Sequence, residues 1–115
     1  MIILDFLDPN NELIHQRFYR ENCIEIGKIL IKDIRIFDRK LKNIVIIDNS
    51  VYAFGYQLDN GIPIISWHNN KHDKELFNLI DYLETLSKVD DIRVLNRHVF
   101  HLHTFYEDCV EEFNS

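Results

Sequence analysis

Four polar side chains have the chemistry of a site for an anion and a metal ion: Arg20, Lys32, Asp48 and Asn49. A guanidinium fork and an ammonium group neutralise phosphoryl oxygens. A carboxylate beside an amide oxygen offers two hard ligands to Mg²⁺. The four residues belong to three successive predicted elements, whose ends could converge at one point. The simpler alternative is that Asp48 or Ser50 only caps the helical turn that follows.

The element that positions Asp48 is a predicted strand over residues 43–48. The four residues before the carboxylate, IVII, are all β-branched, which is typical of a central strand buried on both faces. In open parallel sheets the ligand site lies beyond the carboxyl ends of the strands, which is where Asp48 falls. Residues 62–65 predict a second short strand after a turn at residues 59–61.

The two cations come from elements before that strand. Residues 13–20, LIHQRFYR, alternate with a period of two, which predicts a half-covered strand near a sheet edge that ends at Arg20. Between residues 24 and 37 the apolar spacing changes from two to three around Lys32, as expected where an extended stretch passes into a helical turn. Residues 2–7 predict the end of a helix, which is stopped by the turn that begins at Asp8.

Two helices are predicted in the C-terminal part of the chain. The first follows Asp73 as its N-cap and has apolar residues at helical spacing from Leu76 to Leu86, so it should cover one face of the sheet. The second begins near Asp90 or Asp91. Its apolar residues step by four and three for nearly three heptads: Leu95, Val99, Leu102, Tyr106, Cys109 and Phe113. That stripe either packs on its own domain or pairs with a partner or with a second copy of the chain.

Composition predicts one folded domain inside the cell. The 115 residues are 46% hydrophobic with only 3 Gly and 2 Pro, which is ample for a packed core. No apolar run approaches the roughly 18 residues that cross a bilayer. The two cysteines, at positions 23 and 109, are in no metal-type spacing and suit a reducing compartment. We therefore expect a nuclear or cytoplasmic location and no membrane association.

The charge pattern bears on the partners of the chain. Its net charge of −6 argues against nucleic-acid binding. Residues 28–42 nevertheless hold six basic side chains against only Asp33 and Asp38. This local positive field could serve an anionic ligand, or it could be only a solvated helix face.

Four stretches of the sequence resemble the C-terminal half of the CTD-phosphatase domain, also called the NLI-interacting-factor-like phosphatases, of the haloacid dehalogenase superfamily. They are FLDPNNELIHQRFYRENC, ILIKDIRIFDRKLKNIVIIDNS, FGYQLDNGIPIISW and DKELFNLIDYLETLSKVDDIR. The resemblance covers roughly residues 2–95. It implies that residues 1–95 are the C-terminal half of a haloacid-dehalogenase-like Rossmannoid α/β domain, with three α/β/α layers in the whole fold. Residues 96–115 would be an extra C-terminal helix.

The resemblance also implies a Mg²⁺-dependent protein serine/threonine phosphatase that works through an aspartyl-phosphate intermediate. Lys32 matches the lysine that neutralises the phosphate, and Arg20 matches an arginine near the substrate phosphate. Asp48 and Asn49 match the acidic metal-site pair. The implied catalytic residues are thus Lys32 and Asp48, the implied cofactor is Mg²⁺, and the implied partner is a phosphoprotein.

One motif of the family does not occur in these residues. The family's nucleophile and general acid are the two aspartates of a D-x-D-x-(T/V) motif, and no D-x-D occurs from Met1 to Ser115. We therefore expect the isolated chain to be inactive. The alternative is a non-catalytic domain that binds a phosphopeptide or dimerises through the heptad helix. A missing half would also leave residues 44–47 with an uncovered edge, which the C-terminal helix or a second chain would have to cover.

Overall fold

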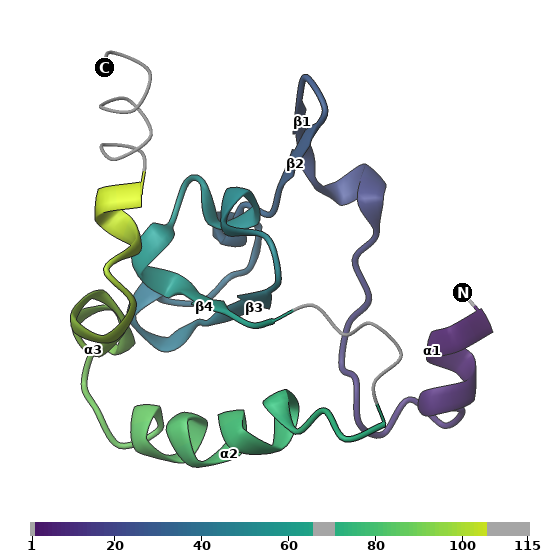
Figure 1. Ribbon diagram of the computed structural model, residues 1–115. Coiled ribbons are helices and arrows are strands. Elements are labelled where there is room, and N and C mark those ends of the chain that lie inside the picture. The colour runs from purple at the N-terminus through teal and green to yellow at the C-terminus, as the bar shows by residue number, and fades with distance from the viewer. Residues whose placement is uncertain (1, 66–70, 106–115) are drawn as a thin grey trace.

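The computed structural model describes residues 2–65 and 71–105 (Figure 1). Its helices and strands are, in chain order, α1 (Ile2–Leu7), β1 (Ile24–Ile26), β2 (Ile29–Ile31), β3 (Ile46–Asp48), β4 (Gly61–Pro63), α2 (Glu75–Leu86) and α3 (Ile92–Phe100). Short 3₁₀ turns occur at η1 (Arg20–Asn22), η2 (Ile34–Ile36), η3 (Leu41–Asn43), η4 (Val51–Phe54), η5 (Leu58–Asn60) and η6 (Leu102–Thr104). The predicted α/β class is confirmed as a mixture of helices and strands. In the described part of the chain, no helix has both the length and the apolar character needed to cross a membrane.

Strands β3 and β4 form a parallel pair at the centre of the molecule, with Ile46 opposite Gly61 and Asp48 opposite Pro63. Both predicted strands are present, but their bounds differ from the prediction. The strand β4 begins at Gly61, inside the predicted turn, and ends at Pro63 rather than at residue 65. The strand β3 is shorter than the predicted 43–48. The reason is that the side-chain amide of the buried Asn60 donates to the carbonyls of Leu41 and Ile44, at 2.6 and 2.8 Å. These bonds hold the chain in the turn η3 until the strand begins.

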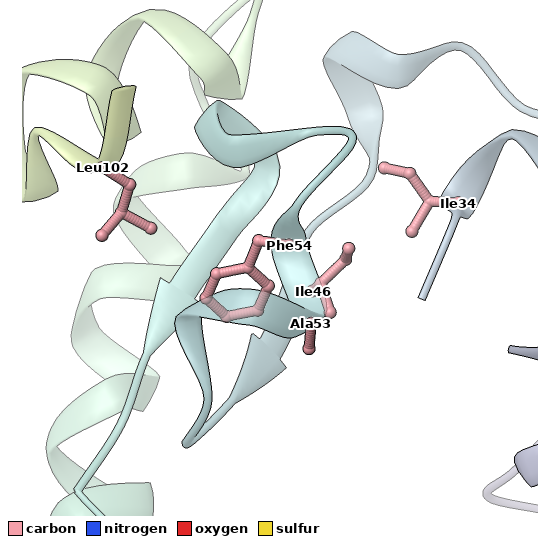
Figure 2. Close-up of a cluster of buried hydrophobic side chains, with 5 residues drawn as sticks. All are labelled: Ile34, Ile46, Ala53, Phe54 and Leu102. Atoms are coloured by element: carbon pink, nitrogen blue, oxygen red, sulfur yellow. The ribbon is translucent and has the colours of Figure 1, made fainter. Parts of the chain in front are cut away.

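One face of β3 packs on a core of five buried residues (Figure 2), which are Ile34, Ile46, Ala53, Phe54 and Leu102. Phe54, with no exposed surface, lies against Gly61 of β4. A Cβ atom at position 61 would collide with the Phe54 ring, so this approach of ring to backbone requires glycine. The turn η4 is therefore pressed directly onto the strand pair.

The other face of β3 packs on α2 and α3. Ile62, Leu79, Leu86 and Ile92 are its buried residues, and Val45 and Ile47 pack against them. Alternate residues of β3 thus face different cores, which confirms the prediction that both faces of this strand are covered. The helix α2 is confirmed, but only part of its predicted apolar stripe is buried: Leu76 and Ile80 are exposed. Asp73 accepts the N–H of Glu75 at 2.8 Å, although Lys74 occupies the N-cap position.

The predicted strand over residues 13–20 is wrong. The backbone N–H groups of Glu12, Leu13 and Ile14 do not join a sheet, because they donate to the carboxylate of Asp8 at 2.8–3.1 Å. The predicted end of the first helix is confirmed, since α1 ends at Leu7 and Asp8 organises the turn that follows. Residues 2–23 thus form an N-terminal arm, which lies to one side of the strand pair in Figure 1.

Residues 24–31 form a hairpin rather than one extended stretch. Strands β1 and β2 are antiparallel, with Ile24 opposite Ile31 and Ile26 opposite Ile29. The two-residue loop begins with Gly27 at φ +61°, a conformation that glycine adopts without strain. The expected change to a helical turn is confirmed, because the turn η2 follows Lys32 at Ile34–Ile36.

The predicted continuous heptad helix is wrong in its described part. Helix α3 begins at Ile92 with Asp91 as its N-cap, close to the predicted start, but His101 adopts φ +52° and ends the helix after Phe100. Leu102 then turns into the core around Phe54 instead of extending a stripe with Leu95. The remaining heptad positions, Tyr106, Cys109 and Phe113, lie outside the described residues.

Candidate functional site

The structure brings two of the four predicted site residues into direct contact. The Lys32 ammonium group lies 2.6 Å from Oδ2 of Asp48, at the carboxyl end of β3. The Lys32 side chain is 50% exposed, whereas that of Asp48 is 13% exposed. The other oxygen, Oδ1, accepts the backbone N–H of Ser50 at 2.9 Å. Asp48 therefore binds both the lysine and the backbone of Ser50. The capping alternative is not confirmed, because the turn η4 has Ser50 at its N-cap position and no side-chain cap bond.

Backbone contacts explain why Lys32 reaches the end of β3. The Lys32 N–H donates to the carbonyl of Ala53 at 3.0 Å, which ties the chain after β2 to the turn η4. That turn follows Asp48 by only a few residues. The buried Ala53 and Phe54 fix η4 on the strand pair, so the position of the ammonium group depends on the core.

Gln57 is a positioning residue that the sequence analysis missed. Its side chain is buried and lies beside the segment that carries Lys32. The side-chain oxygen Oε1 of Gln57 accepts the N–H of Ile34 at 3.2 Å. The side-chain nitrogen Nε2 of Gln57 donates to Oδ1 of Asp33 at 2.9 Å. Only a glutamine after the FGY sequence marks this position, and nothing in its spacing predicts the contact.

The carboxylate of Asp33, which accepts the hydrogen bond from Gln57, is held in its charged form. Two hydrogen bonds from the Arg35 guanidinium, at 2.7 and 3.0 Å, hold the pKa of Asp33 far below its usual range. The bond from Gln57 acts in the same direction. Arg35 also lies over the ring of Tyr56, 5.7 Å from its centroid. The Arg35 guanidinium therefore already has partners within the protein, Asp33 and Tyr56, whereas the Lys32 ammonium group remains half-exposed.

Two cavities lie beside β3 and share Ile47 in their linings. A cavity of about 690 Å³ is lined in part by Asp48 and Asn49. A second cavity, of about 640 Å³, is lined in part by Arg20 and Lys32. Arg20 does not arrive at the end of a strand, as the sequence analysis expected, but begins the turn η1. The structure thus places Arg20 and Lys32 on one cavity and the Asp48–Asn49 pair on the other.

The two edges of β3 differ in their backbone contacts. The Asp48 carbonyl accepts the N–H of Ile64 on the β4 side. Because backbone groups alternate along a strand, those of Val45 and Ile47 point to the opposite edge. Among the described residues, no strand pairs with that edge. The cavities therefore flank a place where another strand would fit.

Asp48 and Asn49 fit one side of a magnesium site. Mg²⁺ takes six oxygen ligands, several of which are usually water, with one or two carboxylates from the protein. The two residues offer one carboxylate and one amide oxygen. Within residues 2–65 and 71–105, no cluster of three or more His, Cys, Asp or Glu side chains could hold a metal ion. Asp73 and Glu75 line the same cavity as Asp48 and Asn49, and they are the other carboxylates that the described residues bring to it.

Comparison with known proteins identifies the family. The sequence model of the NLI interacting factor-like phosphatases matches residues 2–93. The chain belongs to this family. The predicted membership is thus confirmed.

Relatives within the family match most of this chain but are much longer. CTD small phosphatase-like protein 2 of Dictyostelium discoideum is 46% identical over 101 residues, which are 88% of this chain and 18% of that protein. CTD small phosphatase-like protein 3 of Caenorhabditis elegans is 40% identical, over 87% of this chain and 35% of its own length. CTD nuclear envelope phosphatase 1 of Xenopus tropicalis is 39% identical, over 90% and 43%. The chain therefore spans 18–43% of these three relatives.

Proposed function

We propose that these residues form the phosphate-neutralising and metal-facing part of a haloacid-dehalogenase-type protein serine/threonine phosphatase. The observation that carries this proposal is the 2.6 Å ion pair between Lys32 and Asp48 beyond the carboxyl end of β3. This is the end of a parallel strand at which α/β proteins bind ligands. The phosphatase names of the relatives support the same reaction class.

Each predicted site residue has a definite role in this proposal. The half-exposed Lys32 ammonium group binds a phosphoryl oxygen while Asp48 keeps it at the strand end. Arg20, on the same cavity as Lys32, binds the substrate phosphate from the other side. Asp48 and Asn49 would hold Mg²⁺, which when bound would offset the negative charge of the transferred group.

The nucleophile must come from polypeptide outside these 115 residues, because they contain no D-x-D sequence. The free edge of β3 and the two cavities beside it support a sheet that continues there, as a haloacid-dehalogenase-like fold requires. We expect a strand carrying the D-x-D motif at this edge. Its aspartates would then lie beside Asp48, within reach of the phosphate held by Lys32.

Hydrolysis of p-nitrophenyl phosphate tests this proposal in two steps. The purified 115 residues should show no Mg²⁺-dependent hydrolysis above the buffer blank. A chimera should be active if it carries, ahead of Met1, the region that precedes the matched residues in the Dictyostelium relative. Lys32→Ala should lower kcat/KM of the chimera by at least about 100-fold, because it removes a charge-neutralising donor.

Lys74→Ala is the matched control, because this exposed lysine makes no side-chain cap bond. It should leave kcat/KM of the chimera within about twofold, as expected for a surface charge. Turnover by the 115 residues alone would contradict the prediction of inactivity. An active chimera that is indifferent to Lys32→Ala would refute the proposed role of the lysine.

The second candidate is a non-catalytic domain that binds a phosphopeptide or dimerises. The lack of D-x-D in these residues favours it, since Arg20 and Lys32 could bind a phosphate without hydrolysing it. In that case the isolated chain binds a phosphoserine peptide, Lys32→Ala abolishes binding, and the chimera stays inactive. Light scattering tests the dimer. Under either candidate we propose a location inside the cell, nuclear or cytoplasmic, which the nuclear-envelope names of some relatives support.

A further inference from the structure

The six basic side chains of residues 28–42 do not form one continuous positive surface in the folded chain. Three of them are separated from the rest: Lys28 lies in the hairpin loop, Lys32 pairs with Asp48, and Arg35 pairs with Asp33. The other three, Arg39, Lys40 and Lys42, line one hollow of about 560 Å³. The proposed phosphatase site uses none of these three.

Two turns form the walls of this hollow. One wall is the turn η3 and the residues before it, which carry the three cations and Asn43. The other wall is the connection between α2 and α3, which contributes Val89 and Asp90. The hollow is thus lined by three cationic groups, one amide, one carboxylate and the apolar side chain of Val89.

Both walls are fixed to the cores of the molecule. Leu41, in the middle of the first wall, packs against the Phe54 core, and its carbonyl accepts a 2.6 Å hydrogen bond from the buried Asn60. In the second wall Val89 packs against the core beneath α2, and its N–H donates to Leu86 at 3.3 Å. The cationic side chains therefore project from a backbone that needs little ordering when a ligand binds.

The electrostatics of the hollow favour an anion. In the part of the chain that the structure describes, Arg39, Lys40 and Lys42 form no ion pair. Asp90 is the carboxylate on the lining, so the lining carries three positive charges against one negative charge. Asp91 is not on the lining, but its charge interacts with that of Lys42, and it is paired with Arg93 at 2.8 Å. The chain as a whole has a net charge of −6, and this basic hollow is therefore a local reversal of its overall field.

We propose that this hollow docks an acidic segment of a partner polypeptide. The carboxylates of aspartate and glutamate are small enough to enter it, and the lysine and arginine donors match them. The hollow shares no lining residue with the two cavities that flank the ion pair of Lys32 and Asp48. The docking site is thus separate from the phosphatase site and independent of the proposed function.

Other polyanions fit the hollow less well. A nucleic acid needs a longer row of phosphate contacts, and the net charge of −6 repels it at long range. A membrane surface is flat, and it cannot follow cationic groups into a concave site between two turns. A flexible acidic peptide has neither restriction.

Fluorescence polarisation with a fluorescein-labelled hexaglutamate peptide at low salt tests the proposal. The 115-residue chain should bind the peptide. The triple variant Arg39→Ala, Lys40→Ala, Lys42→Ala should lose at least about tenfold in affinity, because it removes all the cations on the lining. Asp90→Asn should raise the affinity about two- to fivefold, because it removes the one opposing charge. Arg39, Lys40 and Asp90 are exposed and Lys42 is half-buried, so circular dichroism verifies that each variant is folded.

The matched control is the triple variant Lys28→Ala, Lys71→Ala, Lys74→Ala, because it also removes three positive charges, from exposed positions that do not line the hollow. It should lose less than about threefold in affinity. An equal loss in this control, or no loss in the variant at residues 39, 40 and 42, would overturn the proposal. So would binding to vesicles containing phosphatidylserine, lost in the variant at residues 39, 40 and 42, by a chain that does not bind the peptide.

Discussion

The N-terminal arm and the body around β3 and β4 use their apolar residues in opposite ways. In the arm, Phe6 is 83% exposed and Leu13 is 77% exposed. In the body, Phe54 is completely buried. Polar contacts organise the arm instead. Asp8 accepts three backbone N–H groups, and Arg17 lies 2.6 Å from Asp5.

This difference shows that local hydrogen bonds can shape a segment without stabilising it. A helix of six residues is marginal in water by itself, and one carboxylate cannot replace a core. The exposed apolar side chains of the arm form a surface of the kind that usually contacts another polypeptide. The body has two cores of its own, so stability should be concentrated there.

The strongest way to test this contrast is to remove one phenylalanine from each region. Phe54→Ala should lower the free energy of unfolding by about 3–5 kcal/mol, because it empties the centre of a closed core. Phe6→Ala should change it by less than about 0.5 kcal/mol, because the ring is already in water. Urea denaturation measures both. Equal effects of the two substitutions would show that the arm is as well packed as the body.

A smaller effect is expected from the polar residue that joins η3 to the body. Asn60→Ala should lower the free energy of unfolding by about 1–3 kcal/mol, because it leaves the carbonyls of Leu41 and Ile44 without their donor. Asn10→Ala in the arm should have almost no effect, because that side chain is exposed. Thermal unfolding of the two variants provides the measurement. A neutral Asn60→Ala would mean that water replaces both bonds.

The smallest expected effect is a local opening of the arm in acid. Hydrogen bonds from the N–H groups of Ile14, Glu12 and Leu13 lower the pKa of Asp8 below its usual value. The stabilisation by Asp8 is therefore complete above about pH 4 and is lost as the pH falls through the lowered pKa. Amide chemical shifts of residues 12–14 should move in that range while those of β3 and β4 change less. In Asp8→Asn, which cannot ionise, the acid transition should disappear.

Strong local patterns made much of the body predictable. The IVII run, the turn at residues 59–61 and the leucine spacing of α2 each gave the correct element, because burial on both faces of a strand or on one face of a helix imposes a period. The position of Asp48 at a strand end followed from the same pattern. The contact of Lys32 with Asp48 was expected only as a convergence, since its atomic basis is the bond from the Lys32 N–H to Ala53.

The errors arose where a single residue overrode a pattern. Residues 13–20 alternate like a strand, but the Asp8 carboxylate takes the N–H groups at the start of that segment. The heptad pattern continues past residue 100, but His101 turns the backbone into the left-handed region. Gln57 has no sequence signal, because its contacts with Asp33 and Ile34 depend on the tertiary fold. None of these three features produces a periodic pattern in the sequence.

The short connection between β3 and β4 has a consequence for the order of folding. Parallel strands are usually joined by a crossover of at least about a dozen residues that forms an α-helix. Here residues 49–60 are near that minimum length and form two 3₁₀ turns instead. Closing a loop of this size costs little chain entropy, so the pairing of Ile46 with Gly61 can form early. The same pairing brings Phe54 onto Gly61. The strand end that carries Asp48 would then take shape early, before the hairpin segment brings Lys32 to it.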